Sequence, residues 1–331
     1  MQLSTNKKSK FIERGLWAGI TVLLLAVPWM ITERYYAYVI ALSGIWTILV
    51  LSLNILVGYT GQVSLCHGSF FGIGAYTSTL LVLKAGWSYW LALPVAALLA
   101  GAIGCLIGIP ALRSKGSYFA ICTLGFGMIV TIILDNWISL TGGSNGISSI
   151  PPPDPIVLPS LGEITFQSQE SQYYLILVTI YFLLFFTRRV MDSRTGRAFL
   201  AVRRDEALAE SIGVDPMRYK LLAFTMGAFF AGVAGSFYSW LVGVITPAVS
   251  SLYVSFEALI FLVVGGVGTL VGPILGTFLL TVAPEYLQVI PEYRMVIYGV
   301  LLFLTIVFMP HGVMGGIRSL AARWRKKFGG G

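Results

Sequence analysis

Long apolar runs constrain this chain more than any other feature of its sequence. The clearest runs are at residues 16–31, 37–57, 90–112, 118–140, 173–187, 221–245 and 295–310. A helix of about 20 apolar residues crosses the hydrocarbon core of a bilayer, where every backbone polar group must be paired within the protein. Hydrophobic residues make up 56% of the chain and charged residues only 11%, which excludes an ordinary soluble domain. The sequence therefore predicts an all-α, polytopic membrane protein.

Two further apolar stretches, at residues 63–83 and 253–282, are less regular. The second is short for two full crossings, so it is expected either to cross twice or to form a re-entrant hairpin. The first run, 16–31, follows four basic residues but no small-residue cleavage site follows it, which indicates a retained span rather than a signal peptide. We expect a bundle of eight to ten transmembrane helices, some of them broken or re-entrant.

Basic residues indicate which loops face the cytoplasm, because short cytoplasmic loops carry an excess of Lys and Arg. Residues 188–220 contain eight of them, whereas residues 141–170 contain none and carry three acids. Basic residues also cluster near both termini, and this inward bias accounts for the net charge of +8 without a nucleic-acid partner. We expect a transmembrane domain at 16–310 between cytoplasmic ends at 1–15 and 311–331, with 141–170 extracytoplasmic and 188–220 cytoplasmic.

A weak internal repeat interrupts the apolar pattern with glycines. Gly58 and Gly61, followed by Gly68 and Gly72, are matched by Gly265 and Gly268, followed by Gly272 and Gly276. One explanation is close packing, because small residues let membrane helices approach one another. The other is that the two Gly-x-x-Gly sequences break helices at corresponding points of two halves, where transporters place backbone that lines a pathway. The second explanation is favoured for Gly58, Gly61, Gly265 and Gly268.

Polar side chains cluster at the first of these breaks. They are Tyr59, Thr60, Gln62, Ser64 and His67. Two acids also fall within apolar runs, where charge is costly: Glu257 lies deep in its run, and Asp135 lies near the outer end of its span. Cys66, Cys105 and Cys122 show no metal spacing, so buried free thiols are expected and no metal site or disulfide. Glu257 and the cluster are candidates for the substrate pathway.

The loop at 188–220 mixes small, apolar and charged residues in a helix-forming pattern. Leu208 and Ile212 are four residues apart, Gly213 is a helix stop, and one helix or two short helices around residues 203–205 fit equally well. A solvated connector is the simplest interpretation, but the mixture favours a docking surface for a cytoplasmic partner. The chain has no Gly-x-x-x-x-Gly-Lys-Ser/Thr sequence, so any ATPase must be a separate polypeptide.

Several sequences in register resemble one family. GYTGQVSLCHGSFFGIGAY at 58–76 is similar to a signature of branched-chain amino-acid ABC importer permeases of the LivM type. Sequences at 113–120, 140–146, 196–213, 255–257 and 265–273 agree in the same order. The resemblance covers roughly residues 37–315.

The resemblance implies a non-enzymatic transport subunit in a bacterial plasma membrane, with both termini cytoplasmic and no cofactor of its own. Its partners would be a second, homologous permease, two cytoplasmic ATPases that bind ATP, and an extracytoplasmic binding protein. By the family pattern residues 196–213 form the coupling segment. The residues carried over for contact with the ATPase are Gly196, Arg197, Arg203, Asp205, Glu206 and Gly213.

Three alternatives remain open at this point. Related permeases serve urea and short amides as well as neutral amino acids, and a pathway with few fixed charges suits any neutral or zwitterionic solute. A proton-coupled secondary carrier would use Glu257 or Asp135. An intramembrane enzyme using Cys66 and His67 is disfavoured, because adjacent helical residues point about 100° apart.

Overall fold

The computed structural model describes residues 33–114, 116–158, 162–286, 299, 303 and 312–316. Within them the protein is a bundle of helices with four very short strands, which confirms the all-α membrane class. The predicted spans at 16–31 and 295–310 fall outside these residues, apart from residues 299 and 303, as do the basic end at 1–15 and residues 317–331. The count of eight to ten spans therefore stays a prediction.

Among the described residues, five helices are long and apolar enough to cross a membrane. They are α2 (Arg34–Thr60), α4 (Tyr89–Ala111), α5 (Ser117–Asn136), α7 (Gln169–Asp192) and α10 (Pro216–Val242). Three shorter helices accompany them: α3 (His67–Leu83), α11 (Leu252–Gly265) and α12 (Gly272–Tyr286). Each predicted span within the described residues is thus helical.

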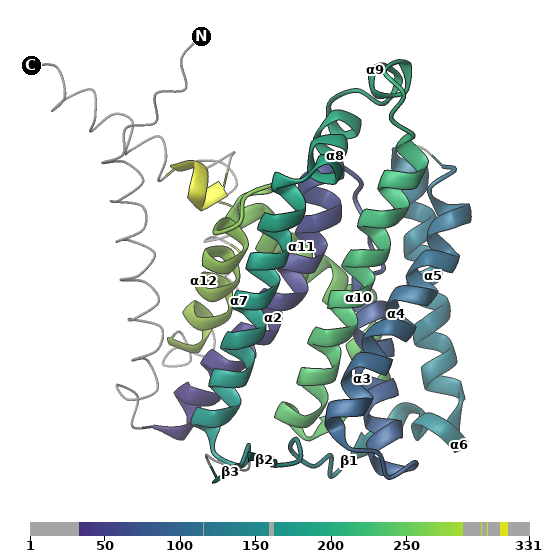
Figure 1. The fold of residues 1–331 in the computed structure, drawn as a ribbon. Helices are drawn as coiled ribbons and strands as arrows, with labels where there is room; N and C mark the ends of the chain where they lie inside the picture. The colour runs from purple at the N-terminus through teal and green to yellow at the C-terminus, as the bar shows by residue number, and fades with distance from the viewer. Residues whose placement is uncertain are drawn as a thin grey trace, which may run out of the picture.

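The remaining elements lie in the connections. They are α6 (Ile138–Thr141), α8 (Arg194–Arg204), α9 (Glu206–Ser211), the 3-10 turns η1 (Gly143–Asn145) and η2 (Pro247–Ser250), and the strands β1 (Ile147–Ser148), β2 (Ile156–Leu158), β3 (Gly162–Ile164) and β4 (Val244–Ile245). β1 pairs antiparallel with β4, and β2 with β3. Figure 1 shows α8 and α9 at one end of the bundle, called here the α9 end, and α6 with β1 to β3 at the other, the β1 end. The two loops predicted to face opposite sides of the membrane therefore lie at opposite ends.

Helix α10 is the centre of the bundle, packed between α2, α3 and α4. Glycines make this packing unusually close: a Cβ placed on Gly74 of α3 would lie 2.1 Å from the carbonyl oxygen of Gly232 of α10, and one on Gly235 would lie 1.8 Å from the oxygen of Phe71. No side chain fits at these points, so the helices meet backbone to backbone. Small residues at helix contacts are the usual way to achieve this in membranes.

Burial separates central helices from peripheral ones. The most apolar window of α2 is 78% buried, whereas those of α5 and α7 are each 22% buried. Large apolar side chains such as Ile121 and Ile129 of α5 and Phe185 of α7 point away from the protein. These outward faces suit lipid or another membrane subunit.

Several span ends differ from the sequence prediction. The span predicted at 118–140 stops at Asn136, and a separate short helix, α6, follows Trp137. The stretch at 63–83 becomes helical only at His67, after a non-helical segment. The stretch at 253–282 forms two helices of 14 and 15 residues, each about 21–23 Å long at 1.5 Å per residue. The 14 residues of α11 are too few to cross the roughly 30 Å hydrocarbon core.

Candidate functional site

The two glycine breaks of the sequence repeat meet at the α9 end of the bundle. Gly58 lies in the last turn of α2, and Gly268 lies in the connection between α11 and α12, with φ +78°. Arg203, near the end of α8, donates a hydrogen bond from Nη1 to the carbonyl oxygen of Gly58. A Cβ on Gly268 would lie 2.7 Å from that Nη1 and 2.9 Å from that oxygen, so only glycine fits.

Asn54, one turn earlier in α2, holds the second break against the first. Its Oδ1 accepts a hydrogen bond from the Gly268 N–H at 2.9 Å, and its Nδ2 donates to the Thr269 carbonyl at 2.8 Å. Asn54 is fully buried, so both bonds satisfy groups that would otherwise be unpaired away from water. We call Asn54, Gly58, Arg203 and Gly268 the Arg203 junction.

A charged cluster beside this junction attaches α9 to the bundle. Glu206, the first residue of α9, forms an ion pair with Lys220 of α10, whose side chain is only 5% exposed. The side-chain amide of Gln62, just after the first break, lies 3.5 Å from the same carboxylate. Because a buried ammonium is costly without a partner, this pair holds the start of α9 against α10. Gln62, Glu206 and Lys220 are called the Glu206 cluster.

Two short helices begin at a common point in the interior. The Gly68 N–H at the start of α3 donates to Ser255 Oγ in the first turn of α11 at 2.8 Å. From there α3 runs to the β1 end and α11 to the α9 end (Figure 1). A Cβ on Gly68 would lie 2.7 Å from the Ser251 oxygen, and one on Gly72 would lie 2.5 Å from Ser250 Cβ. The structure thus supports the packing explanation for Gly68 and Gly72.

We call the point where α3 and α11 begin the half-helix junction, and define it as Gly68, Ser69, Ser250 and Ser255. Hydroxyl groups of this junction form further hydrogen bonds. The carbonyl oxygen of Ser250 accepts from Ser69 Oγ at 3.3 Å and from Thr131 Oγ1 of α5 at 3.1 Å. Ser69 Oγ also lies 3.3 Å from the carbonyl of Gly127, which is half-way along α5. The junction therefore lies at mid-bundle depth, where half-helix ends form substrate sites in many transporters.

Comparison with known sequences decides the family. The family described as "Branched-chain amino acid transport system / permease component" matches residues 35–306. The chain belongs to this family of permeases. No solved structure matches it.

Curated relatives of this permease cover most of its length. The high-affinity branched-chain amino acid transport system permease protein LivM of Escherichia coli (strain K12) is 37% identical over 313 residues, which is 89% of this chain and 74% of the relative. LivH of the same organism is 28% identical over 298 residues, 83% of this chain and 93% of the relative. BraD of Pseudomonas aeruginosa is 26% identical over 292 residues, again 83% and 93%. The resemblance identified from motifs is confirmed.

The residues predicted for the pathway lie in three places in the permease: at the α9 end, near the start of α3, and within α11. Gly58, Gly268 and Gln62 lie at the α9 end, in the Arg203 junction and the Glu206 cluster. Gly265 ends α11, where a Cβ would lie 2.1 Å from the Gly272 oxygen, and Gly61 caps α2 with φ +75°. Tyr59 is buried, and Thr60 Oγ1 bonds back to the Leu56 carbonyl at 2.8 Å. The structure does not bring the predicted set together as one site.

Ser64 and His67 lie deeper, at the start of α3. His67 Nδ1 is 3.1 Å from Ser64 Oγ, and the same hydroxyl is 3.3 Å from Cys66 Sγ. All three residues are fully buried, and a Cβ on Gly227 of α10 would lie 3.0 Å from His67 Nε2. These contacts hold the non-helical segment 61–66 against α10. Of the other cysteines predicted to be buried, Cys105 is half-buried and Cys122 is exposed on the outward face of α5.

The two intramembrane acids lie far apart. Glu257 is half-buried in α11 and has no ion pair among the described residues. Asp135 is exposed at the β1 end of α5, where it accepts a hydrogen bond from Ser144 Oγ at 2.7 Å. Its position agrees with the expected interfacial solvation.

The residues predicted for ATPase contact mostly shape the loop itself. Asp205 caps α9 by accepting from the Leu208 N–H at 3.0 Å, and Arg197 lies 3.4 Å from the Asp192 carbonyl. Gly196 packs against Met191, where a Cβ would lie 2.4 Å from its Cα, and Gly213 has φ +84° after α9. Two short helices form, one of the two predicted arrangements.

Sequence reasoning missed Asn54, Ser250 and the role of Lys220. Asn54 carried a usable signal, since it is the only side-chain amide in the apolar run of α2 and an intramembrane polar group usually has a partner. Lys220 was counted only as a basic loop residue. Its burial depends on the packing of α9 against α10, which no local pattern indicates.

Proposed function

We propose that this permease is the membrane-spanning half of an ATP-driven importer for branched-chain or other neutral amino acids. The observation that carries the proposal is the construction of the α8–α9 loop. It presents an apolar surface at one end of the molecule, and Arg203 bonds it to the carbonyl oxygen of Gly58, in the first glycine break, which Asn54 joins to the second break at Gly268. A segment built in this way can receive a partner's movement and pass it to the spans.

The proposed dock for an ATPase is the outer side of α9. Leu208 is 64% exposed and Ile212 is 69% exposed, although both lie outside the apolar spans. Figure 1 shows α9 projecting beyond the ends of the long helices. Exposed apolar residues ringed by charges are typical of protein interfaces. The charged residues Glu206 and Asp205 are occupied within the loop, so apolar contact is the proposed main attraction.

The Arg203 junction supports a mechanism for transmission. Movement of α8 would shift the ends of α2 and α11 together, because Arg203 bonds α8 to Gly58 of α2, and Asn54 bonds α2 to Gly268 in the connection after α11. From α11 the movement would reach the half-helix junction, where α3 begins. ATP binding would then favour one of two arrangements of the bundle, by its differential affinity for the two.

The proposed partners follow from the family. A second permease would complete the pathway, two cytoplasmic subunits would bind and hydrolyse ATP, and an extracytoplasmic protein would deliver substrate. The chain is similar both to LivM and to LivH, each named as a permease protein of a high-affinity branched-chain amino acid transport system. On this proposal the α9 end is cytoplasmic, the membrane is a bacterial plasma membrane, and the chain needs no cofactor.

The names of these relatives refer to branched-chain amino acids. The alternatives of urea or short amides, and of a proton-coupled carrier, have no support among them. We therefore retain a branched-chain or other neutral amino acid as the proposed substrate.

Reconstitution of the assembled complex in proteoliposomes tests the proposal. Leucine uptake should require ATP, both ATPases and the binding protein. Leu208→Ser with Ile212→Ser should reduce co-purification of the ATPases and abolish uptake without loss of folded permease. Val244→Ser, which alters an exposed side chain at the opposite end, is the matched control and should leave both unchanged. Uptake by the permease alone, driven by a pH gradient and lost in Glu257→Gln, would contradict the proposal.

A further inference from the structure

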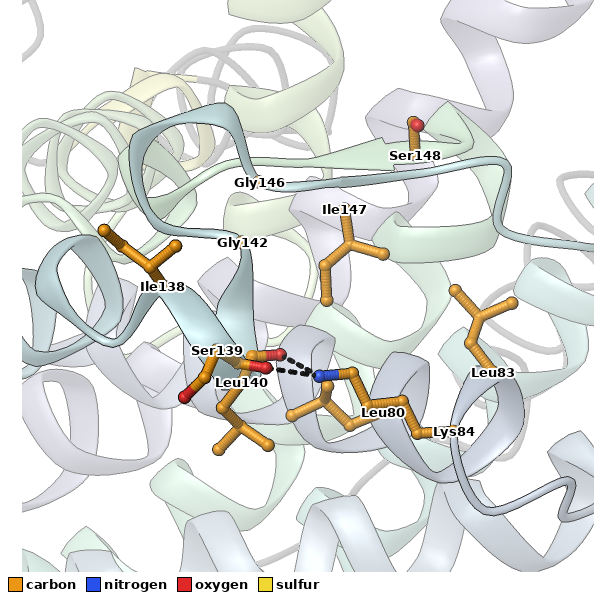
Figure 2. Close-up of a pocket in the computed structure, with 10 residues that line it drawn as sticks. All are labelled: Leu80, Leu83, Lys84, Ile138, Ser139, Leu140, Gly142, Gly146, Ile147 and Ser148. Carbon is orange, nitrogen blue, oxygen red and sulfur yellow. Dashed lines mark hydrogen bonds between the residues drawn. The ribbon is translucent and has the colours of Figure 1, made fainter.

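A cavity of about 310 Å³ opens at the β1 end, away from the sites described above. It lies between the end of α3, the short helix α6 and the strand β1 (Figure 2). Its volume is at the lower limit of the range for small-molecule sites. A cavity of this size suits a molecule as small as an amino acid.

One positively charged side chain, that of Lys84, lines this cavity. Lys84, the residue after α3, donates from Nζ to the carbonyl oxygens of Ser139 and Leu140, each at 2.9 Å (Figure 2). An ammonium has three N–H groups, so one donor remains. No carboxylate forms an ion pair with Lys84 within the part of the chain that the structure describes. The group is therefore positioned to receive an anion.

The rest of the wall is largely aliphatic. Its large apolar side chains are those of Leu80, Leu83, Ile138, Leu140 and Ile147. Figure 2 shows Ile147 pointing from its strand toward Leu80 on the opposite wall. The hydroxyl-bearing residues Ser139 and Ser148 also line the cavity. One ammonium among branched aliphatic side chains complements a molecule with a carboxylate and a short aliphatic chain.

Helix α3 extends from the cavity to the interior of the bundle. Helix α3 has Lys84 directly after its last residue and the half-helix junction at its first turn, about 25 Å away over 17 residues. A ligand bound at Lys84 would thus contact the same helix whose start pairs with α11.

We propose that the Lys84 cavity is a low-affinity entry site on the extracytoplasmic side for a branched-chain amino acid released by the binding protein. The substrate carboxylate binds the third N–H of Lys84, and its side chain packs between Leu80 and Ile147. The inference rests on the proposed substrate and orientation. It adds a binding residue, Lys84, and a binding location, the cavity at the β1 end, to that proposed substrate and orientation.

Binding to the full-length permease in nanodiscs of zwitterionic lipid tests the site. Saturation-transfer NMR should show contact with the methyl groups of leucine. 4-Methylpentanoate, which keeps the carboxylate and chain, should compete, whereas isoamylamine, which lacks the carboxylate, should not. Lys84→Gln keeps amide donors for Ser139 and Leu140 but loses the charge, and should weaken leucine binding about fivefold, the upper end for an exposed ion pair. Lys84→Arg should largely restore binding.

Ile147→Phe fills the cavity without touching the cation and should also weaken binding, which keeps the test decisive if Lys84→Gln folds poorly. Leu98→Phe, on an exposed face of α4, is the control and should bind normally. Leucine binding that is absent, or unchanged in both cavity variants, would overturn the proposal. Competition by acetate equal to that by 4-methylpentanoate, or displacement of leucine by anionic lipid, would overturn it as well. Because no ATPase or ATP is present, these outcomes are separate from failure of the transport function.

Discussion

Lys220 and Glu206 show how one buried charge can organise a loop. The Lys220 side chain is 5% exposed and that of Glu206 is 37% exposed, so the two partners differ in their access to water. A carboxylate left alone here could still be partly hydrated, whereas an ammonium left alone could not. Removing either partner should therefore have unequal consequences.

We expect Glu206→Gln to destabilise the permease more than Lys220→Met. Stranding the buried ammonium should cost roughly 2–4 kcal/mol, whereas Lys220→Met should cost about 1 kcal/mol. Melting temperatures in detergent, followed by tryptophan fluorescence, measure the difference. Arg218→Met breaks the exposed pair with Asp215 and is the control, with an expected effect below about 0.5 kcal/mol. Equal losses for Glu206→Gln and Lys220→Met would contradict the unequal burial.

At the scale of elements, α3 and α10 pack closely because glycines leave no side chain between their backbones. Gly74, Gly232 and Gly235 bring the two backbones into direct contact. Such a contact cannot yield by rotating a side chain, because the atoms in the way belong to the main chain. The position of α3, and with it the half-helix junction, depends on this approach.

Gly235→Ala should therefore separate α3 from α10. The added methyl would lie 1.8 Å from the Phe71 carbonyl oxygen, and we expect loss of the monodisperse peak in size-exclusion chromatography and of leucine uptake. Gly125→Ala on α5 is the matched control, since its methyl would meet nothing within 4 Å, and it should behave as the wild type. A well-folded Gly235→Ala protein would show that α3 can move away without cost.

At the scale of the whole molecule, the loops separate into two faces. The basic loop with α8 and α9 lies at one end, and the loop with α6 and β1 lies at the other (Figure 1). The β1–β4 pairing joins the second loop to the segment that leads from α10 to η2 and α11. The entry cavity and the proposed ATPase dock are thus at opposite ends, as an importer requires.

The orientation can be measured by labelling single cysteines in a variant with Cys66, Cys105 and Cys122 replaced. A membrane-impermeant maleimide should label Asn145→Cys in spheroplasts and Ser211→Cys only after permeabilisation. Both positions are exposed and lie at opposite ends. The reverse pattern would place α9 outside and would contradict the dock. The cysteine-free parent, unlabelled on both sides, is the control.

The amino-acid sequence was enough to predict the membrane class, most of the spans, the two breaks and the family. These features depend on local composition: apolar length selects a membrane helix, and Gly-x-x-Gly interrupts it. It also predicted that the loop at 188–220 is built of helix-forming residues.

Which of these features are in contact became known from the three-dimensional packing. Gly58 and Gly268 are 210 positions apart, and nothing local indicates that Asn54 bonds to Gly268 or that Arg203 bonds to Gly58. The polar residues near His67 formed one cluster in the sequence, yet Gln62 lies with Glu206 while Ser64 and His67 face α10. In the sequence Lys84 is an ordinary loop lysine, whereas in the structure it lines a cavity beside α6 and β1. Contacts of this kind depend on how distant helices pack, and that packing depends on the shape of the whole bundle.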